Sequence, residues 1–207
     1  MKTLIVAATK AELSIFYQHF NLGEGDFSER KNFDVLITGV GMVATAFSLG
    51  KYLSPKYNLV INLGIAGCFD RNIPLGSLVS VTADTFAELG AENGDEFLTI
   101  NDLGFGENHY TATSIQKTGL TEGTGVTVNR VSGSEQSIKN LVQRLNPTTE
   151  SMEGAAVFYA CNQQHIDCLQ VRSISNYVEP RNKDNWKMGL AIKNLNDWAI
   201  SFIGEMN

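Results

Sequence analysis

Short apolar runs that alternate with stretches of helical periodicity constrain the fold of this chain more than any other feature. The run at residues 4–8 is continuous, which is typical of a strand covered on both faces in a parallel sheet. Apolar side chains at helical spacing follow it, at Leu13, Phe16, Tyr17 and Phe20. This alternation recurs along the chain, and strands that alternate with helices predict a single α/β domain with a mostly parallel sheet.

The turns between these runs set the expected boundaries. A polar loop is expected at residues 21–32, and glycine-rich turns at 39–41 and 64–67 are expected to end the second and third strands. Residues 86–122 are rich in Gly, Asn, Asp and Thr, which predicts a long excursion that forms a rim over the site. The further expected strands cover residues 33–37, 59–63, 78–81, 126–131 and 169–174, and the further expected helices cover residues 42–53, 133–145, 154–164 and 185–203.

Two capping boxes mark expected helix starts. Thr9 is followed three residues later by Glu12, and Ser132 is followed in the same way by Glu135. In this motif the hydroxyl of the first residue and the carboxylate of the second each accept a backbone N–H. A structural role therefore explains Glu12 without any catalysis, and a role as general base stays open beside it.

Composition and charge exclude several classes of partner. The chain has 207 residues, and its 22 acidic against 16 basic residues give a formal net charge of −6, which argues against nucleic acid or an anionic membrane as partner. The N-terminal apolar run is too short for a signal peptide, and no stretch has the length of a membrane span. Three cysteines without CxxC spacing indicate reduced thiols in a cytoplasmic protein. His19, His109 and His165 are isolated in the sequence, so we expect no metal site, and Cys161 and Cys168 are expected in the core.

The stretch at residues 149–156 places a carboxylate before a tightly packed helix. Glu153 is followed by Gly154 and two alanines, so backbone or ligand can come close to it. A helix N-terminus favours an ionised carboxylate, and a fixed anion is suited to accept hydrogen bonds from sugar hydroxyls. Two interpretations stay open from this stretch alone: Glu153 binds a sugar, or it only caps the helix.

A second motif favours a different class of protein. Gly39-x-Gly41-x-x-Ala44, between a strand and a helix, matches the dinucleotide-binding fingerprint. The turn follows the second strand rather than the first, and the next strand ends without the acid that would bind a ribose. A Rossmann-type oxidoreductase is therefore an alternative and not the first prediction. The turn still places backbone amides at the carboxyl edge of the sheet, where α/β folds bind ligands.

Taken in order, the motifs of the chain resemble those of the nucleoside phosphorylase and nucleosidase superfamily, most closely the methylthioadenosine/adenosylhomocysteine nucleosidases. They are Glu12 after the first strand, Gly39-Val40-Gly41-Met42-Val43-Ala44, Asn62-Leu63-Gly64-Ile65-Ala66-Gly67, Ser151-Met152-Glu153-Gly154-Ala155-Ala156 and Arg172-Ser173-Ile174-Ser175-Asn176. The resemblance covers nearly the whole chain and fails mainly in residues 86–122. It implies one nucleosidase domain, residues 1–207, with three layers: a mixed, mostly parallel central sheet flanked by helices.

The last motif departs from those nucleosidases in a way that indicates the substrate. They end it in Asp, which protonates the leaving purine, whereas this chain has Asn176. The ending resembles futalosine hydrolase, a relative in menaquinone biosynthesis that releases hypoxanthine. Ile65 and Cys68 also depart from the Ser and Gly that usually flank this Ala-Gly pair, Ala66 and Gly67, which the resemblance places in the substrate site.

The resemblance also implies a role for each remaining site residue. Cleavage of an N-ribosidic bond passes through an oxocarbenium-like sugar, as in glycoside hydrolysis. By resemblance Glu153 binds the ribosyl hydroxyls, Met152 packs on the sugar face, and Glu12 deprotonates the attacking water. Asn176 stabilises the leaving purine. The reaction needs no metal and no organic cofactor.

The chemistry of Asn176 favours hypoxanthine or guanine over adenine. Its amide can donate to the oxo acceptor of a 6-oxopurine, whereas adenine presents an amine that a carboxylate would accept. A second interpretation, that Asn176 only forms a turn at a strand end, stays open. Arg172 is expected to be structural, and Arg181 and Lys183 are expected to be solvated loop charges.

We therefore predict a nucleosidase that converts futalosine to hypoxanthine and dehypoxanthine futalosine, binds no nucleic acid or membrane, and forms a homodimer or larger homo-oligomer as its relatives do. Within the superfamily, the alternatives are a methylthioadenosine/adenosylhomocysteine nucleosidase and a purine nucleoside phosphorylase. A phosphorylase would need basic side chains around a phosphate, and Lys10 is the only one in the first turn, while the glycine-rich turns carry none. Outside the superfamily, the alternatives are the oxidoreductase and a non-catalytic nucleoside-binding module.

Overall fold

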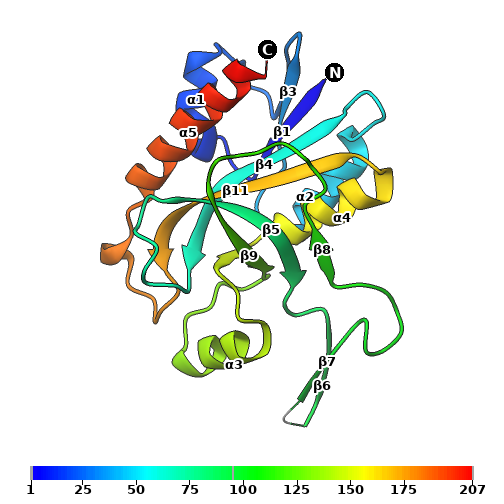
Figure 1. Ribbon diagram of the computed structural model, residues 1–207, viewed down its shortest axis with the longest axis vertical. Helices are drawn as coiled ribbons and strands as arrows, with labels where there is room; N and C mark the ends of the chain where they lie inside the picture. The colour runs from blue at the N-terminus through cyan, green and yellow to red at the C-terminus, as the bar shows by residue number, and fades with distance from the viewer. Residues whose placement is uncertain (1, 95, 207) are drawn as a thin grey trace.

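The computed structural model describes residues 2–94 and 96–206, and a large sheet between two layers of helices dominates it (Figure 1). Among the described residues, nine strands form this sheet in the order β10-β9-β5-β11-β4-β1-β3-β2, with β8 beside β5. These strands are β1 (Thr3–Ala7), β2 (Phe27–Glu29), β3 (Phe33–Ile37), β4 (Leu59–Cys68), β5 (Leu78–Phe86), β8 (His109–Thr111), β9 (Thr121–Thr127), β10 (Thr149–Ser151) and β11 (Asp167–Tyr177). A separate hairpin consists of β6 (Gly90–Asn93) and β7 (Glu96–Thr99).

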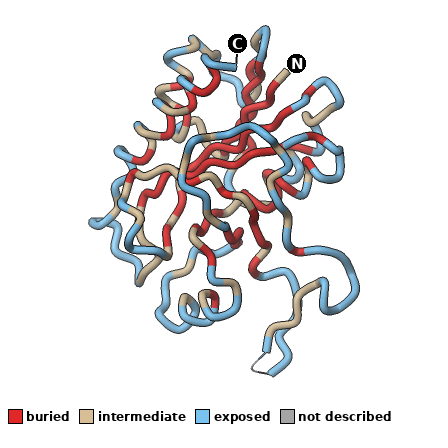
Figure 2. The backbone as a smooth tube through the Cα atoms, in the orientation of Figure 1, coloured by how far each residue is buried: buried red, intermediate tan, exposed pale blue. Residues whose placement is uncertain are grey.

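The helices cover both faces of the sheet. A short 3-10 helix, η1 (Ala11–Leu13), leads into α1 (Ser14–His19), which packs with α5 (Met188–Glu205) on one face. The other face carries α2 (Met42–Tyr52) and α4 (Gly154–Gln164), while α3 (Glu135–Leu145) lies with the β6–β7 hairpin at one end of the molecule (Figure 1). Figure 2 shows that the buried residues follow the central strands between these layers.

Apolar side chains fill the space on each side of the sheet. Phe16, Leu195 and Phe202 of the α1–α5 layer pack against one face, and Leu49 and Phe158 of the α2–α4 layer pack against the other. Strands buried on both faces explain why their sequences read as apolar runs. The predicted three-layer architecture is confirmed.

The sheet is mixed and mostly parallel, as predicted. Parallel pairs join β1 to β3 and β4, β4 to β11, and β9 to β5 and β10. Antiparallel pairs join β5 to β11 and β8, β10 to β4 and β2 to β3. Because β10 pairs with both β9 and β4, the strands β4, β11, β5, β9 and β10 close into a ring at one end of the sheet.

The predicted turn at residues 64–67 is wrong, because these residues continue β4 to Cys68. Their glycines serve close packing rather than a change of direction. A Cβ at Gly64 would overlap the guanidinium of Arg172, and a Cβ at Gly67 would lie 2.9 Å from Cγ2 of Val178. Glycine in a strand often marks such a close approach.

Other predicted boundaries also differ from the structure. The polar loop at 21–32 contains β2, which pairs with β3 at the edge of the sheet, and the excursion at 86–122 contains β6, β7 and β8. The strand predicted at 126–131 is β9, which begins at Thr121 because its glycines admit the neighbouring strand: a Cβ at Gly125 would lie 2.7 Å from Oδ2 of Asp84.

Two helix starts were predicted too early. The residue that caps α3 is Ser134 rather than Ser132, since Ser134 directly precedes the helix and its Oγ accepts from the backbone nitrogen of Ser137 at 3.3 Å. The final helix begins at Met188, because residues just before it form the 3-10 helix η2 (Lys183–Asn185). By contrast, the predicted bounds of the helix after Glu153 agree with α4.

Candidate active site

The candidate site residues meet at one edge of the sheet. The strands β1, β3, β4 and β11 run parallel, so their carboxyl ends lie together. Glu12 follows β1, Gly41 follows β3, and Asn176 lies near the end of β11. Glu153 lies in the link between β10 and α4 and reaches the same edge.

The two carboxylate oxygens of Glu12 have different hydrogen-bond partners. Its Oε2 accepts from the backbone nitrogen of Thr9 at 3.0 Å and from Thr9 Oγ1 at 2.9 Å, while the Glu12 nitrogen donates to Thr9 Oγ1 at 3.3 Å. The predicted capping box is therefore confirmed. The other oxygen, Oε1, accepts from the backbone nitrogen of Ile65 at 3.1 Å, so it faces β4 and the edge where the other site residues lie.

The surroundings of Glu12 suit a general base. Burial raises the pKa of Glu12 above its usual value; the Ile65 N–H, the charge of Arg172 and the Thr9 hydroxyl lower it, and the nearby Glu153 raises it. The net pKa is raised. A carboxylate whose pKa is raised toward neutrality takes a proton from water more readily than an exposed one.

Glu153 is held by a residue far away in the sequence. Its Oε1 accepts a hydrogen bond of 2.8 Å from the backbone nitrogen of Gly41, which has a φ of 92° that favours glycine. The Glu153 side chain makes no capping hydrogen bond to α4, so the interpretation of Glu153 as a simple helix cap is wrong. The same contact uses the amide that a dinucleotide phosphate would need at the start of α2.

Asn176 lies within β11, opposite Gly67 of β4, so the interpretation as a turn residue is also wrong. Its Oδ1 accepts from Ser175 Oγ at 2.8 Å, and its Nδ2 donates to the carbonyl oxygen of Tyr177 at 3.0 Å. These two bonds fix the orientation of the amide. Since a carboxamide nitrogen carries two N–H groups, one of them can donate to a ligand.

The remaining predicted residues lie beside these three. Ala66 is buried, and its carbonyl oxygen accepts from Ser175 Oγ at 3.2 Å. Gly67 pairs with Asn176, and Met152 lies between β10 and Glu153. Ser175, which orients Asn176, was not identified from the sequence, although it is the neighbouring residue in the same motif.

The basic side chains near this edge have protein partners. Lys10 donates to the carbonyl oxygen of Glu24 and lies 3.8 Å from a carboxylate oxygen of Asp26. Arg181 lies over the ring of Trp186, with 5.2 Å between its guanidinium carbon and the ring centre, and its side chain is exposed as predicted. Lys10 therefore has partners in the loop after α1, which gives no support to a phosphate site of the phosphorylase type.

The excursion at residues 86–122 borders the site on one side. A cavity of about 760 Å³ lies between the excursion, including Leu89, Ile100 and Phe105, and residues of α2 and α4 such as Met42 and Ala156. Met42 and Ala156 are in the first turns of their helices, close in sequence to Gly41 and Glu153. The excursion thus lies next to the first turns of α2 and α4, and its role as a rim over the site stays a prediction.

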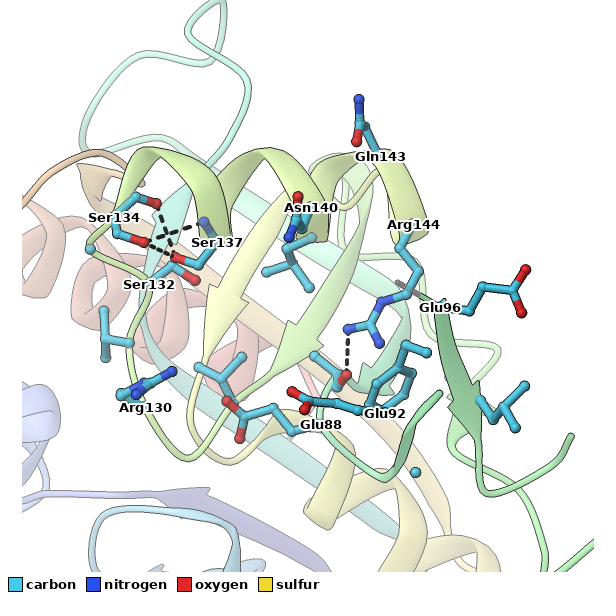
Figure 3. Close-up of a pocket in the computed structure, with 18 of the residues that line it drawn as sticks. Glu88, Glu92, Glu96, Arg130, Ser132, Ser134, Ser137, Asn140, Gln143 and Arg144 are labelled. Carbon is cyan, nitrogen blue, oxygen red and sulfur yellow. Dashed lines mark hydrogen bonds between the residues drawn. The ribbon is translucent and has the colours of Figure 1, made fainter. Parts of the chain in front are cut away.

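A larger cavity, of about 1290 Å³, lies between α3 and the β6–β7 hairpin (Figure 3). Arg144 donates to the carbonyl oxygen of Ala87 at 2.6 Å, and its guanidinium carbon lies 4.0 Å from the ring centre of Phe97. Figure 3 shows Glu88 and Glu92 near this arginine. The residues that line this larger cavity come from parts of the chain other than the motifs that contain Glu12, Glu153 and Asn176.

Within residues 2–94 and 96–206, no cluster of three or more His, Cys, Asp or Glu side chains could hold a metal ion. Across the same residues, no helix has both the length and the apolar character needed to cross a membrane. Cys161 and Cys168 are buried in the core, as predicted, and Cys68 is also a buried free thiol.

Comparisons with known proteins agree with this geometry. The phosphorylase superfamily model matches residues 5–203. A futalosine hydrolase of Streptomyces coelicolor is 35% identical over 177 residues, which cover 79% of this chain and 75% of that protein. A futalosine hydrolase of Thermus thermophilus is 29% identical over 174 residues, which cover 79% of this chain and 77% of that protein.

Solved structures show the same fold at lower identity. A futalosine hydrolase of Helicobacter pylori superposes with a TM-score of 0.83 at 16% identity, covering 99% of this chain and 98% of that one. A 5'-methylthioadenosine/S-adenosylhomocysteine nucleosidase of the same organism gives 0.84 at 17% identity, with the same coverage. The resemblance inferred from the motifs is confirmed. This chain belongs to the phosphorylase superfamily and, within it, to the family of the futalosine hydrolases.

Proposed function

We propose that this protein hydrolyses the N-ribosidic bond of futalosine and releases hypoxanthine and dehypoxanthine futalosine. The observation that supports this proposal is the amide of Asn176, which is held by Ser175 and Tyr177 at the same sheet edge as Glu12 and Glu153 and has a second N–H that could donate to a base. A donor at this place suits the oxo group or ring nitrogen of a 6-oxopurine. The similarity to futalosine hydrolases supports the same substrate.

In the proposed mechanism, water attacks the anomeric carbon as the bond to the purine nitrogen breaks. Glu12 takes a proton from the water, and the electron pair of the broken bond goes to the purine. The positive charge that develops on the sugar strengthens the hydrogen bonds from its hydroxyls to the Glu153 carboxylate. Asn176 donates a hydrogen bond to the departing base. Glu12 then releases the proton that it took from water, and the departing base takes up a proton from solvent to give neutral hypoxanthine, which balances the reaction.

The alternatives lack this kind of support. Gly41 N, which a dinucleotide would need, donates to Glu153, and Lys10, which a phosphorylase would need, is held by Glu24 and Asp26. Family membership excludes the oxidoreductase. An adenine-specific nucleosidase would be served better by an acceptor at position 176 than by the amide of Asn176.

We also propose that the protein acts in the cytoplasm as a homo-oligomer. Val43 and Phe47 of α2 and Phe105 of the excursion are 77%, 74% and 78% exposed, and apolar side chains of this size rarely gather on the free surface of a monomer. Three free cysteines are consistent with a reducing compartment. Light scattering on the purified protein should give the mass of a dimer or a larger assembly, and a monomer at micromolar concentration would contradict the assembly.

The test of the activity is incubation with futalosine in phosphate-free buffer, with hypoxanthine measured by chromatography. We expect hypoxanthine and dehypoxanthine futalosine in equal amounts, and we expect added phosphate to change neither the rate nor the products. Methylthioadenosine serves as the comparison substrate. Faster release of adenine, formation of a sugar phosphate, or no release of base would each contradict the proposal.

A further inference from the structure

A continuous chain of buried polar side chains runs beneath the candidate site. Arg172, Asn62, Gln170 and Asp84 are all at most 1% exposed, and they come from β11, β4, β11 and β5. Arg172 Nη1 donates to Asn62 Oδ1 at 3.4 Å, and Asn62 Nδ2 donates to Gln170 Oε1 at 2.9 Å. Gln170 Nε2 then donates to Asp84 Oδ2 at 2.8 Å. Buried polar groups are costly unless they are paired, so such a chain calls for a physical reason.

The two ends of this chain set its direction. The guanidinium of Arg172 can only donate, and an ionised carboxylate such as Asp84 can only accept. The two amides between them can do either, so each must present oxygen toward Arg172 and nitrogen toward Asp84. The guanidinium of Arg172 and the carboxylate of Asp84 therefore require the same arrangement, in which the oxygen of Asn62 faces Arg172.

This row of hydrogen-bonded side chains also contacts the backbone segment that binds Glu12. Gly64 pairs with Arg172 in the register of β4 and β11, and a Cβ at Gly64 would overlap Arg172 Nη1 and lie 3.0 Å from Glu12 Oε1. The next residue, Ile65, donates its backbone N–H to Glu12. The charge of Arg172 lowers the pKa of Glu12 against the effect of burial, so the position of the guanidinium affects the proposed base directly.

The second oxygen of Asp84 leads to Glu153. Asp84 Oδ1 accepts from Thr127 Oγ1 at 2.9 Å, and Thr127 Oγ1 accepts from the backbone nitrogen of Ala155 at 2.7 Å. Ala155 is in the first turn of α4, two residues after Glu153. A Cβ at Gly154 would overlap Asp84 Oδ2, so the start of α4 packs directly on this carboxylate.

We propose that Asp84 is a positioning residue for the reaction: its carboxylate directs the buried chain that holds Arg172 beside Glu12, and it anchors through Thr127 the turn that carries Glu153. This inference rests on the proposed nucleosidase function. Burial raises the pKa of Asp84, and its bonds from Gln170 and Thr127 and the charge of Arg172 lower it; the net pKa is about 6, so the carboxylate is mostly ionised at neutral pH. Asp84 touches no substrate in this account and acts only through the residues it holds.

The test exchanges the carboxylate at position 84 and the amide at position 170. Asp84→Asn replaces one of the two acceptor oxygens with a donor, which must face either Gln170 or Thr127, so we expect kcat per folded molecule to fall by about tenfold or more, the effect of one misdirected buried polar group. Gln170→Glu alone places two carboxylates face to face and should also impair the enzyme. In the double variant the new amide at position 84 donates to the new carboxylate at position 170, which still accepts from Asn62, so the direction toward Arg172 is restored. We expect kcat to return to within about threefold of the parent.

Asp34→Asn is the matched control. Asp34 is equally buried, accepts from Tyr57 Oη at 2.7 Å and pairs with Lys2 at 2.8 Å, but it lies in β3 near the end of the strand that is remote from Glu12 and Glu153. We expect Asp34→Asn to lower the melting temperature and leave kcat unchanged. If Asp84→Asn behaves in the same way, or if the folded double variant does not recover kcat, the proposal is wrong.

Crystal structures of the parent, Asp84→Asn and the double variant provide a readout that does not depend on the substrate. We expect either the Arg172 guanidinium to turn away from Asn62 or the Thr127 contact to Ala155 to shift in Asp84→Asn, and we expect the changed contact to return in the double variant. A structure in which both contacts are unchanged would overturn the proposal. If the parent does not cleave futalosine but one of these contacts changes as expected, the proposed function fails and the directing role of Asp84 stands. If Asp84→Asn does not fold, Gln170→Glu alone provides the same test, because it removes the donor to Asp84 Oδ2 and is expected to give the same losses.

Discussion

The Glu153 carboxylate accepts a hydrogen bond of 2.8 Å from the backbone nitrogen of Gly41, 112 residues earlier in the chain. This contact joins the start of α2 to the start of α4, two helices that pack on the same face of the sheet. One oxygen of Glu153 is thereby fixed in place, and the helix N-terminus next to it favours the ionised form. In the proposed mechanism the other oxygen binds the ribosyl hydroxyls.

Glu153→Gln should lower kcat by about 100-fold or more, since the amide keeps the bond from Gly41 but weakens the charge-assisted bond to the ribosyl hydroxyls in the transition state. The melting temperature should change little. Steady-state kinetics and thermal unfolding measure the two effects separately. A variant that unfolds early but turns over normally when folded would assign Glu153 a structural role.

Glu12→Gln should reduce hydrolysis by orders of magnitude while the protein stays folded. The Gln oxygen can keep the bonds from Thr9, but the amide cannot remove a proton from water. Ser134→Ala provides a control for lost capping, because it removes the cap of α3 and should cost about 0.5–2 kcal/mol without lowering kcat. Near-normal turnover of Glu12→Gln would leave this residue only its capping role.

The pH dependence of kcat/KM should show an acidic limb set by Glu12. Its pKa is raised above 4.5, mainly by burial, and the base works only when it is ionised. Activity should therefore be full above this raised pKa and fall about tenfold per pH unit below it. Initial rates measured across the range in which the protein stays folded would test this. A limb at or below pH 4.5 would show that Glu12 is not the titrating base.

Gly154→Ala should destabilise the protein by about 1–3 kcal/mol, the usual cost of forcing extra atoms into a packed interior. The new methyl group would overlap Asp84 and lie 2.5 Å from Gln170 Oε1. Gly50→Ala is the matched control, because a Cβ at this position of α2 meets nothing within 4 Å and should stabilise the helix by up to about 1 kcal/mol. Urea unfolding curves of both variants give the comparison, and equal stability would contradict it.

Local pattern predicted the architecture well and the role of individual glycines poorly. The apolar runs gave the central strands because they are buried on both faces, and the Glu153 junction gave the bounds of α4. Gly64 and Gly67 indicated a turn, yet they lie in β4 because Arg172 and Val178 pack against them. Only the paired strand explains these glycines, and that strand is more than 100 residues away in the sequence.

The residues of the candidate site could be predicted from the sequence, whereas most of their contacts could not. Glu12, Glu153 and Asn176 could be named from motifs, because each motif contains the residue itself. Thr9 could be predicted as the local partner of Glu12, but the distant partners could not be predicted. Gly41 N, Ile65 N and the hydrogen-bonded side chains from Asp84 to Arg172 come together only through strand order and register. The family resemblance implies the roles of these three residues, and the structure shows their contacts.

The most direct test of the account is the base preference of the parent and of Asn176→Asp. The amide nitrogen of Asn176 donates to the carbonyl oxygen of Tyr177 at 3.0 Å, so a carboxylate oxygen in its place would face that carbonyl and the purine oxo group as a further acceptor. A misplaced buried polar group costs roughly 1–3 kcal/mol, or about ten- to a hundredfold in rate. The measurement is kcat/KM for matched hypoxanthine and adenine nucleosides with both proteins. We predict that the parent prefers the hypoxanthine nucleoside and that Asn176→Asp narrows or reverses this preference. An unchanged ratio would mean that Asn176 does not recognise the base and would contradict the proposed choice of futalosine.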